Sequence, residues 1–177
     1  MISRQSNNVS GDFRMLGDEL KSKHNLQVVY LCRTLDGGVD STIFTKISYG
    51  FHMFTQMYHL ATSKVCVLDS YSPVVCILNH KKSLKIVQIW HSIGVMKKFG
   101  WQIIGNREGS SETIAKVMKM HRNYDVIYCA GEKCKQVLIE GFNADDSKMR
   151  VFPLPRVDLL KDKNYIAETK EKIYQKC

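Results

Sequence analysis

The chain has 177 residues, of which 44% are hydrophobic, and it carries a formal net charge of +9 at pH 7. This composition is typical of one globular domain with a buried core, and it excludes fibrous and disordered classes. No apolar run approaches the roughly 18 residues that a membrane-spanning helix needs, and the first residues lack the apolar core of a signal peptide. We therefore expect a cytoplasmic location.

The positive charge bears on the partners of the protein, and the cysteine spacing bears on disulfides and zinc sites. The charge favours polyanionic partners, namely nucleic acid, anionic lipid headgroups or phosphate-rich substrates, but a solvated basic surface without a partner accounts for it as well. The six cysteines form no Cys-x-x-Cys pair. We predict reduced thiols rather than disulfides or zinc ligands at Cys32, Cys66, Cys76, Cys129, Cys134 and Cys177.

Five segments are predicted to be helices, the first four from the apolar spacing of amphipathic helices and the last as a polar terminal helix. They cover residues 11–23, 45–63, 109–121, 132–141 and 164–176, and Asp12 is positioned to cap the first of them. The second has the clearest pattern. Its predicted core face is an aromatic-rich stripe of Ile47, Phe51, Phe54, Tyr58 and Ala61, with Met57 at the edge. A membrane-surface role is the alternative for this helix, although its opposite face carries few cations.

Five short runs of β-forming residues separate these helices. They cover residues 26–32, 65–68, 86–90, 125–129 and 149–152, whereas 74–78 is too short to assign. The alternation predicts an α/β fold, in which a Rossmann-like parallel sheet carries helices on both faces. Only Met1-Ile2-Ser3 precedes the first helix, so the sheet either opens late or takes its first strand from a longer parent protein.

The loops that follow parallel strands gather at one edge of the sheet, where open α/β sheets bind their ligands. Here these loops contain Asp69-Ser70, His91-Ser92, Ala130-Gly131 and Pro155-Arg156. His91 is the strongest candidate for chemistry, because a neutral imidazole can accept a proton from a hydroxyl near pH 7. The alternative is that His91 has a purely structural role.

Cations near this histidine in the sequence suit a phosphate-bearing ligand. The lysines are Lys81, Lys82, Lys85, Lys97 and Lys98, each of which could equally belong to a solvated rim. Arg156 offers the forked geometry with which arginine binds phosphate, and a salt bridge to Asp158 is its alternative role. The sequence carries no signature of a dinucleotide, triphosphate, serine-hydrolase or metal site.

Around His91 the sequence resembles the CDP-glycerol glycerophosphotransferase family, which includes the teichoic acid primases and polymerases. The family's usual string, Q-x-W-H-G-T-P-x-K-x-x-G, is similar to the segment that runs from Gln88 through His91 to Gly100. Residues 124–127 followed by 142–143, and the turn at 153–160, resemble two further segments of the family. Residues 2–6 resemble the end of a first strand in some members.

This resemblance implies a two-domain enzyme similar to GT-B glycosyltransferases. Residues 1–177 would form its N-terminal, acceptor-side domain, which is inactive alone because the C-terminal nucleotide-binding domain is missing. His91 would be the general base that deprotonates a glycerol-phosphate acceptor, so that its oxygen attacks the β-phosphorus of CDP-glycerol and expels CMP. Ser92-Ile93-Gly94 stands where the family has Gly-Thr-Pro, and Pro153 replaces a glycine, so other polyol phosphates stay open as acceptors.

The resemblance also implies partners and binding residues. CDP-glycerol or a related CDP-polyol is the expected donor, with no tightly bound cofactor and no metal. The expected acceptor is a glycerol-phosphate-type anionic polymer, of the teichoic acid or capsular kind, met at the inner face of the cell membrane. The expected substrate-binding residues are Trp90, Ser92, Gly94, Lys97, Lys98, Arg156, Asp69 and Ser70.

Two other functions stay open. One is a non-catalytic module that binds phosphate polymers or anionic surfaces. The other is a nucleic-acid-binding α/β domain, which the charge permits but no sequence motif supports, so no nucleic acid partner is expected.

Overall fold

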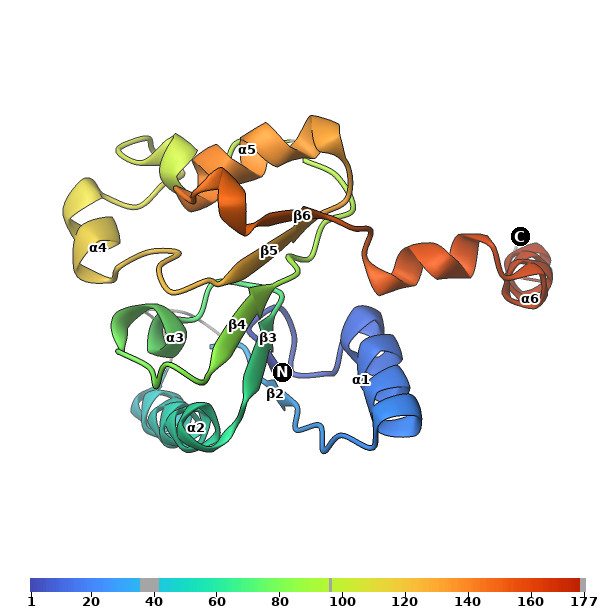
Figure 1. The fold of residues 1–177 in the computed structure, drawn as a ribbon, viewed down its shortest axis with the longest axis horizontal. Helices are drawn as coiled ribbons and strands as arrows, with labels where there is room; N and C mark the ends of the chain where they lie inside the picture. The colour runs from blue at the N-terminus through green and yellow to red at the C-terminus, as the bar shows by residue number, and fades with distance from the viewer. Residues whose placement is uncertain (36–41, 96, 176–177) are drawn as a thin grey trace.

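The computed structural model describes residues 1–35, 42–95 and 97–175. Within them, six parallel strands form one sheet in the order β2-β1-β3-β4-β5-β6 (Figure 1). The strands are β1 (Ile2–Ser3), β2 (Leu31–Cys32), β3 (Val65–Leu68), β4 (Lys85–Gln88), β5 (Val126–Cys129) and β6 (Met149–Val151). The predicted α/β fold with a parallel sheet is confirmed.

Helices connect the strands in the described residues. The α-helices are α1 (Gly11–His24), α2 (Ile43–Thr62), α3 (Pro73–Ile77), α4 (Glu112–Val117), α5 (Glu132–Phe142) and α6 (Lys163–Tyr174). The 3-10 helices are η2 (Gly100–Ile103), η3 (Asp146–Lys148) and η4 (Pro155–Leu160). The undecided run at 74–78 is therefore helical. The strand expected at 26–32 and the helix expected at 109–121 are much shorter than predicted.

The first strand shows how the sheet opens. Ile2 pairs with Leu31 of β2 on one side and with Leu68 of β3 on the other, so β1 lies inside the sheet. The strand order reverses here, because the chain moves from β1 outward to β2 and then returns to β3 on the opposite side. Such a reversal opens a crevice at the carboxyl ends of the two strands, and ligands of open α/β sheets bind there.

Alternate residues of the strands face two different cores, as the pleat requires. Leu68 and Ile127 belong to the larger core, which also includes residues of α2, α3 and α5. Val67 belongs to the smaller core around Phe13 of α1. Figure 1 shows α1 on one side of the sheet and α2 and α3 on the other. The predicted helices on both faces are thus confirmed.

The predicted core face of α2 is wrong. Ile47, Phe51, Phe54 and Tyr58 are among the exposed large hydrophobic residues, and the helix buries Tyr49, Gln56 and Leu60 instead. Half-buried Met53 and Met57 widen the buried face. Both sides of the helix carry apolar residues at helical spacing, so periodicity alone does not decide which side meets the sheet.

A close approach of two glycines joins the segment after His91 to α5. Gly100 has φ of 57°, and a side chain there would collide with the carbonyl oxygen of Gly141. Gly141 in turn lies against the ring of Phe99. The helix α5 continues to Phe142, one residue beyond its predicted end, and is capped by Asn143 in the left-handed conformation.

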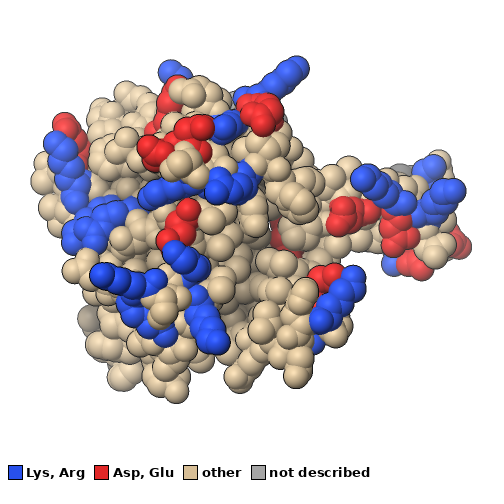
Figure 2. Space-filling view, viewed as in Figure 1, with Lys and Arg blue, Asp and Glu red and all other residues tan. Residues whose placement is uncertain are grey.

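Most lysines near His91 in the sequence are far from it in the fold. Lys81, Lys82 and Lys85 precede or begin β4, whereas His91 follows its end, so they lie at the amino edge of the sheet. Lys85 pairs there with Asp125, and Lys81 donates to the carbonyl of Ala61 at the end of α2. In Figure 2 basic side chains gather over this region, below the acidic residues of the upper part.

Cys32, Cys66, Cys76, Cys129 and Cys134 are free thiols, three of them in the core as predicted, and Cys177 lies outside the described residues. In the described residues no helix is long and apolar enough to cross a membrane.

Candidate active site

Trp90 turns the chain out of the direction of β4. Its φ of 61° lies in the left-handed region, which bulky residues rarely adopt. Two interactions hold this conformation: the Trp90 N–H donates to Oε1 of Gln88 at 2.9 Å, and its ring stacks on Phe99 with 4.7 Å between ring centres. The turn directs the next residue, His91, back toward the crevice at the ends of β1 and β3.

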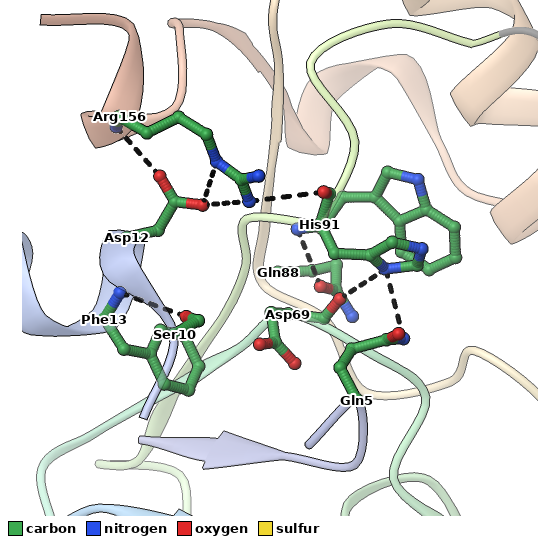
Figure 3. Close-up of polar contacts among 9 residues, drawn as sticks. Gln5, Ser10, Asp12, Phe13, Asp69, Gln88, His91 and Arg156 are labelled. Atoms are coloured by element: carbon green, nitrogen blue, oxygen red, sulfur yellow. Dashed lines mark hydrogen bonds and ion pairs between the residues drawn. The ribbon is translucent and has the colours of Figure 1, made fainter. Parts of the chain in front are cut away.

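The interactions of His91 define its tautomer (Figure 3). Nδ1 lies 2.9 Å from the main-chain oxygen of Asp69. Because a carbonyl can only accept, Nδ1 carries the proton, and Nε2 is left as an acceptor. Nδ1 also lies 3.3 Å from Nε2 of Gln5, which can only donate, so the shorter contact with the Asp69 carbonyl is the hydrogen bond in this tautomer. No described residue hydrogen-bonds Nε2, so His91 can accept a proton from a ligand hydroxyl.

Asp69 and Ser70 lie beneath this histidine and are both buried. Burial raises the pKa of the Asp69 carboxyl, against hydrogen bonds from Ser3 and Ser70 and the nearby His91, which lower it. Its Oδ1 has no hydrogen-bond partner among the described residues. Asp69 therefore holds His91 through its main chain and places a carboxyl group close to the ring. The Ser70 hydroxyl accepts a hydrogen bond from the main-chain N–H of Arg4 at 3.0 Å.

Arg156 pairs with Asp12, whereas its predicted alternative partner was Asp158. Asp12 is only 2% exposed; it accepts from the Arg156 main-chain N–H at 2.9 Å and from Nε at 2.7 Å, and it forms an ion pair with the terminal nitrogen. The same guanidinium donates to the main-chain oxygen of His91 at 3.3 Å (Figure 3). Arg156 thus ties α1 and η4 to the histidine turn. Asp12 is not the cap of α1, because Ser10 accepts from the Phe13 N–H there.

The remaining predicted binding residues lie on the other side of Trp90. Ser92 donates to the carbonyl of Gly94, and both residues line a small pocket toward β5 and α5. With a volume of about 10 Å³ this pocket holds at most one water molecule. Lys97 and Lys98 are exposed. The fold therefore brings five of the predicted residues together, namely Asp69, Ser70, Trp90, His91 and Arg156. The other four predicted residues, Ser92, Gly94, Lys97 and Lys98, are not part of this group.

Three residues of this region were missed by the sequence analysis: Arg4 and Gln5, which follow β1, and Asp12. The only available signal for Arg4 and Gln5 was their place after a first strand, and that strand has two residues. The described residues contain no cluster of His, Cys, Asp or Glu that could hold a metal ion. The arrangement as a whole offers proton transfer by His91 at the edge of an open crevice.

Comparisons with known proteins agree with this fold and show the family. The model of the family "CDP-Glycerol:Poly(glycerophosphate) glycerophosphotransferase" matches residues 1–176. The chain belongs to this family.

Two curated relatives from Bacillus spizizenii (strain W23) are named for ribitol phosphate. The teichoic acid ribitol-phosphate primase is 28% identical over 175 residues, which are 99% of this chain and 44% of that protein. The teichoic acid poly(ribitol-phosphate) polymerase is 30% identical over 167 residues, which are 94% of this chain and 25% of that protein. The chain thus spans less than half the length of these relatives.

The fold also matches a solved structure. The wall teichoic acid polymerase TagF superposes with a TM-score of 0.65 at 14% identity, over 98% of this chain and 43% of that chain. At this identity the likeness shows the fold alone.

Proposed function

We propose that this chain is the acceptor-side, N-terminal half of a GT-B-type transferase that uses CDP-glycerol or a related CDP-polyol to build a teichoic acid or capsular polymer. The observation that carries the proposal is the tautomer of His91. Nδ1–H donates to the Asp69 carbonyl, so Nε2 is left unprotonated and is able to act as a general base. Membership of the glycerophosphotransferase family supplies the reaction class.

In the proposed step, Nε2 of His91 takes the proton from the terminal hydroxyl of the acceptor. The hydroxyl oxygen forms a bond to the β-phosphorus of the donor, and the bond from that phosphorus to the bridging oxygen breaks. CMP leaves with the electron pair of the broken bond. The Asp69 carboxyl, close to the ring, stabilises the imidazolium that forms.

The polyol is either glycerol or ribitol in this proposal. The family description names glycerophosphate, whereas the names of two relatives specify ribitol phosphate. One TagF structure, with a TM-score of 0.66 at 13% identity, was soaked with CDPG, which is consistent with a CDP-linked donor. We propose that the donor nucleotide is held mainly by a second domain beyond this chain.

We also propose that the protein works as a peripheral protein at the inner face of the cell membrane. The outward face of α2 supports this location. Its six apolar residues are between 52% and 80% exposed: Ile43, Phe44, Ile47, Phe51, Phe54 and Tyr58. Two exposed lysines lie at the carboxyl end of this helix: Lys64 follows it in the chain, and Lys81 donates to the carbonyl of Ala61. Their charge complements anionic lipid headgroups.

The proposed reaction is tested by replacing the base in the full-length protein. We expect His91→Ala to lower kcat for CMP release from CDP-glycerol or CDP-ribitol by about 10²- to 10⁴-fold, the usual contribution of a general base. His24→Ala, on the exposed end of α1, is the matched control. Unchanged thermal unfolding would show that the loss is chemical. A rate within a few-fold of the parent protein would remove His91 from the mechanism.

A further inference from the structure

A wide cleft adjoins the candidate active site at the reversal of the strand order. It has a volume of about 430 Å³, and its lining includes Arg4, Ser70, Trp90, Glu108, Ser110 and His121. Gln5 also lines the cleft, and its amide nitrogen lies 3.3 Å from Nδ1 of His91, so the cleft adjoins the proposed base. It is also large enough for a polyol phosphate, unlike the small pocket beside Ser92 and Gly94.

Arg4 supplies a cation that is held in place but not neutralised. Its Nε donates to the Tyr49 hydroxyl at 2.9 Å, and one terminal nitrogen donates to the Tyr71 carbonyl at 3.3 Å. These bonds use two of the five N–H donors of a guanidinium. No carboxylate of a described residue forms an ion pair with it, in contrast to Arg156, which is engaged by Asp12. A preoriented arginine with free donors is suited to the oxygens of a phosphate group.

His121 adds a neutral imidazole to the same wall. Burial lowers the pKa of its imidazole to about 4, so it stays uncharged at neutral pH. Nδ1 lies 3.1 Å from the Tyr124 hydroxyl, which is able both to donate and to accept. Nε2 lies beside Gly100, another lining residue. His121 therefore contributes an uncharged polar group to this wall of the cleft.

We propose that this cleft binds the phosphate-bearing end of the acceptor, with Arg4 on the phosphate oxygens and Glu108, Ser110 and His121 on polyol hydroxyls. The inference rests on the proposed function and assigns its acceptor site. A carboxylate and a hydroxyl opposite an arginine suit a ligand with both an anionic group and neutral hydroxyls. Such a ligand is a polyol phosphate, either free or at the end of a polymer.

The test measures binding of glycerol 3-phosphate and, for comparison, uncharged glycerol to the full-length protein by calorimetry. We expect Arg4→Gln to weaken glycerol 3-phosphate binding by roughly ten- to hundredfold, the loss of a charge-assisted contact. Arg14→Gln, on an exposed arginine of α1, is the matched control and should leave binding unchanged. Equal binding by Arg4→Gln and the parent protein would overturn the proposal, as would an equal loss in both variants.

A second variant guards against misfolding, because Arg4 also ties Tyr49 and Tyr71 together. Ser110→Phe adds bulk at an exposed position on the cleft wall. It should weaken the binding of glycerol 3-phosphate without affecting thermal unfolding. Undiminished binding in this variant would also overturn the site.

Steady-state kinetics separate the site from the reaction. If CMP is released but the KM for the phosphate-bearing acceptor is unchanged in Arg4→Gln, the site is wrong while the function stands. If glycerol 3-phosphate binding depends on Arg4 but no CMP is released, the site is correct and the proposed function is wrong.

Discussion

Two histidines of the candidate site region, His91 and His121, lie in different environments. Nδ1 of His91 meets a main-chain carbonyl, which leaves Nε2 as an acceptor. Nδ1 of His121 meets a tyrosine hydroxyl within the core, and burial keeps its imidazole neutral. Residue type alone does not distinguish them. The environment of each ring does.

The pair of Asp12 and Arg156 should matter more for stability than any surface ion pair. We expect Arg156→Gln to lower the free energy of unfolding by about 3–5 kcal/mol, because it removes the only cation that pairs with the buried Asp12 carboxylate among the described residues. Arg156→Lys should lower the free energy of unfolding by less, since lysine keeps the positive charge but lacks the forked geometry of the guanidinium group. Urea unfolding measures both, with Arg14→Gln as the exposed control, expected within about 0.5 kcal/mol of the parent. A loss no larger than that of the control would contradict this role.

The titration of His121 should make the protein less stable in mild acid. Its pKa in the folded state, about 4, lies below the value of about 6.5 in the unfolded chain. The unfolded state therefore binds the proton first, so stability falls as pH drops from 6.5 toward 4 and is fully present above 6.5, with a span on the order of 3 kcal/mol. The raised pKa of Asp69 acts in the opposite direction, since its contribution is lost as pH rises.

The measurement is the free energy of unfolding as a function of pH for the parent protein and His121→Asn. Asparagine suits the φ of 62° at this position. The slope between pH 6.5 and 4 should be flatter in the variant. An identical slope would mean that another group causes the acid sensitivity.

At the scale of elements, α2 shows that an amphipathic pattern can be correct in period and wrong in direction. The helix has apolar residues on both sides, and the sheet takes the side with Tyr49, Gln56 and Leu60. The aromatic side is left exposed. An exposed apolar face of this size is unusual on a monomeric protein unless it has a partner.

The two faces of α2 should therefore respond differently to substitution. Replacing Phe51 and Phe54 by serine should change the free energy of unfolding by no more than about 0.5 kcal/mol per site, because both side chains are exposed. Leu60→Ala, on the buried face, should cost about 2–5 kcal/mol.

The same double variant tests the membrane proposal. Sedimentation of the full-length protein with vesicles containing anionic lipid should show reduced binding for the serine variant and unchanged binding for Leu60→Ala at temperatures where it is folded. Full binding by the serine variant would assign the membrane contact to another surface.

For the molecule as a whole, the candidate site occupies one edge of the sheet. The residues that would handle the acceptor surround the ends of β1, β3 and β4, and no Gly-rich phosphate loop accompanies them. This distribution is consistent with a donor site on another domain, and the chain covers 44% of the first relative.

Calorimetry on residues 1–177 alone should accordingly show only weak CDP-glycerol and CDP-ribitol binding, with dissociation constants of about 1 mM or weaker, on the order of 4 kcal/mol. The full-length protein should bind the donor more tightly. Tight binding to the isolated chain would contradict the assignment of this domain to the acceptor.

The sequence by itself determined the α/β class, the parallel sheet and the place of His91 after a strand, because strand and helix periods and the position of a residue after a strand are local features. Its similarity to a known family also indicated the reaction class before any contact was known. Only the tertiary structure decided which side of α2 is buried, that Arg156 pairs with Asp12, and that Arg4, Gln5 and His121 line one cleft with Trp90. Asp12 and Arg156 are 144 residues apart in the chain, and packing alone brings them within hydrogen-bonding distance.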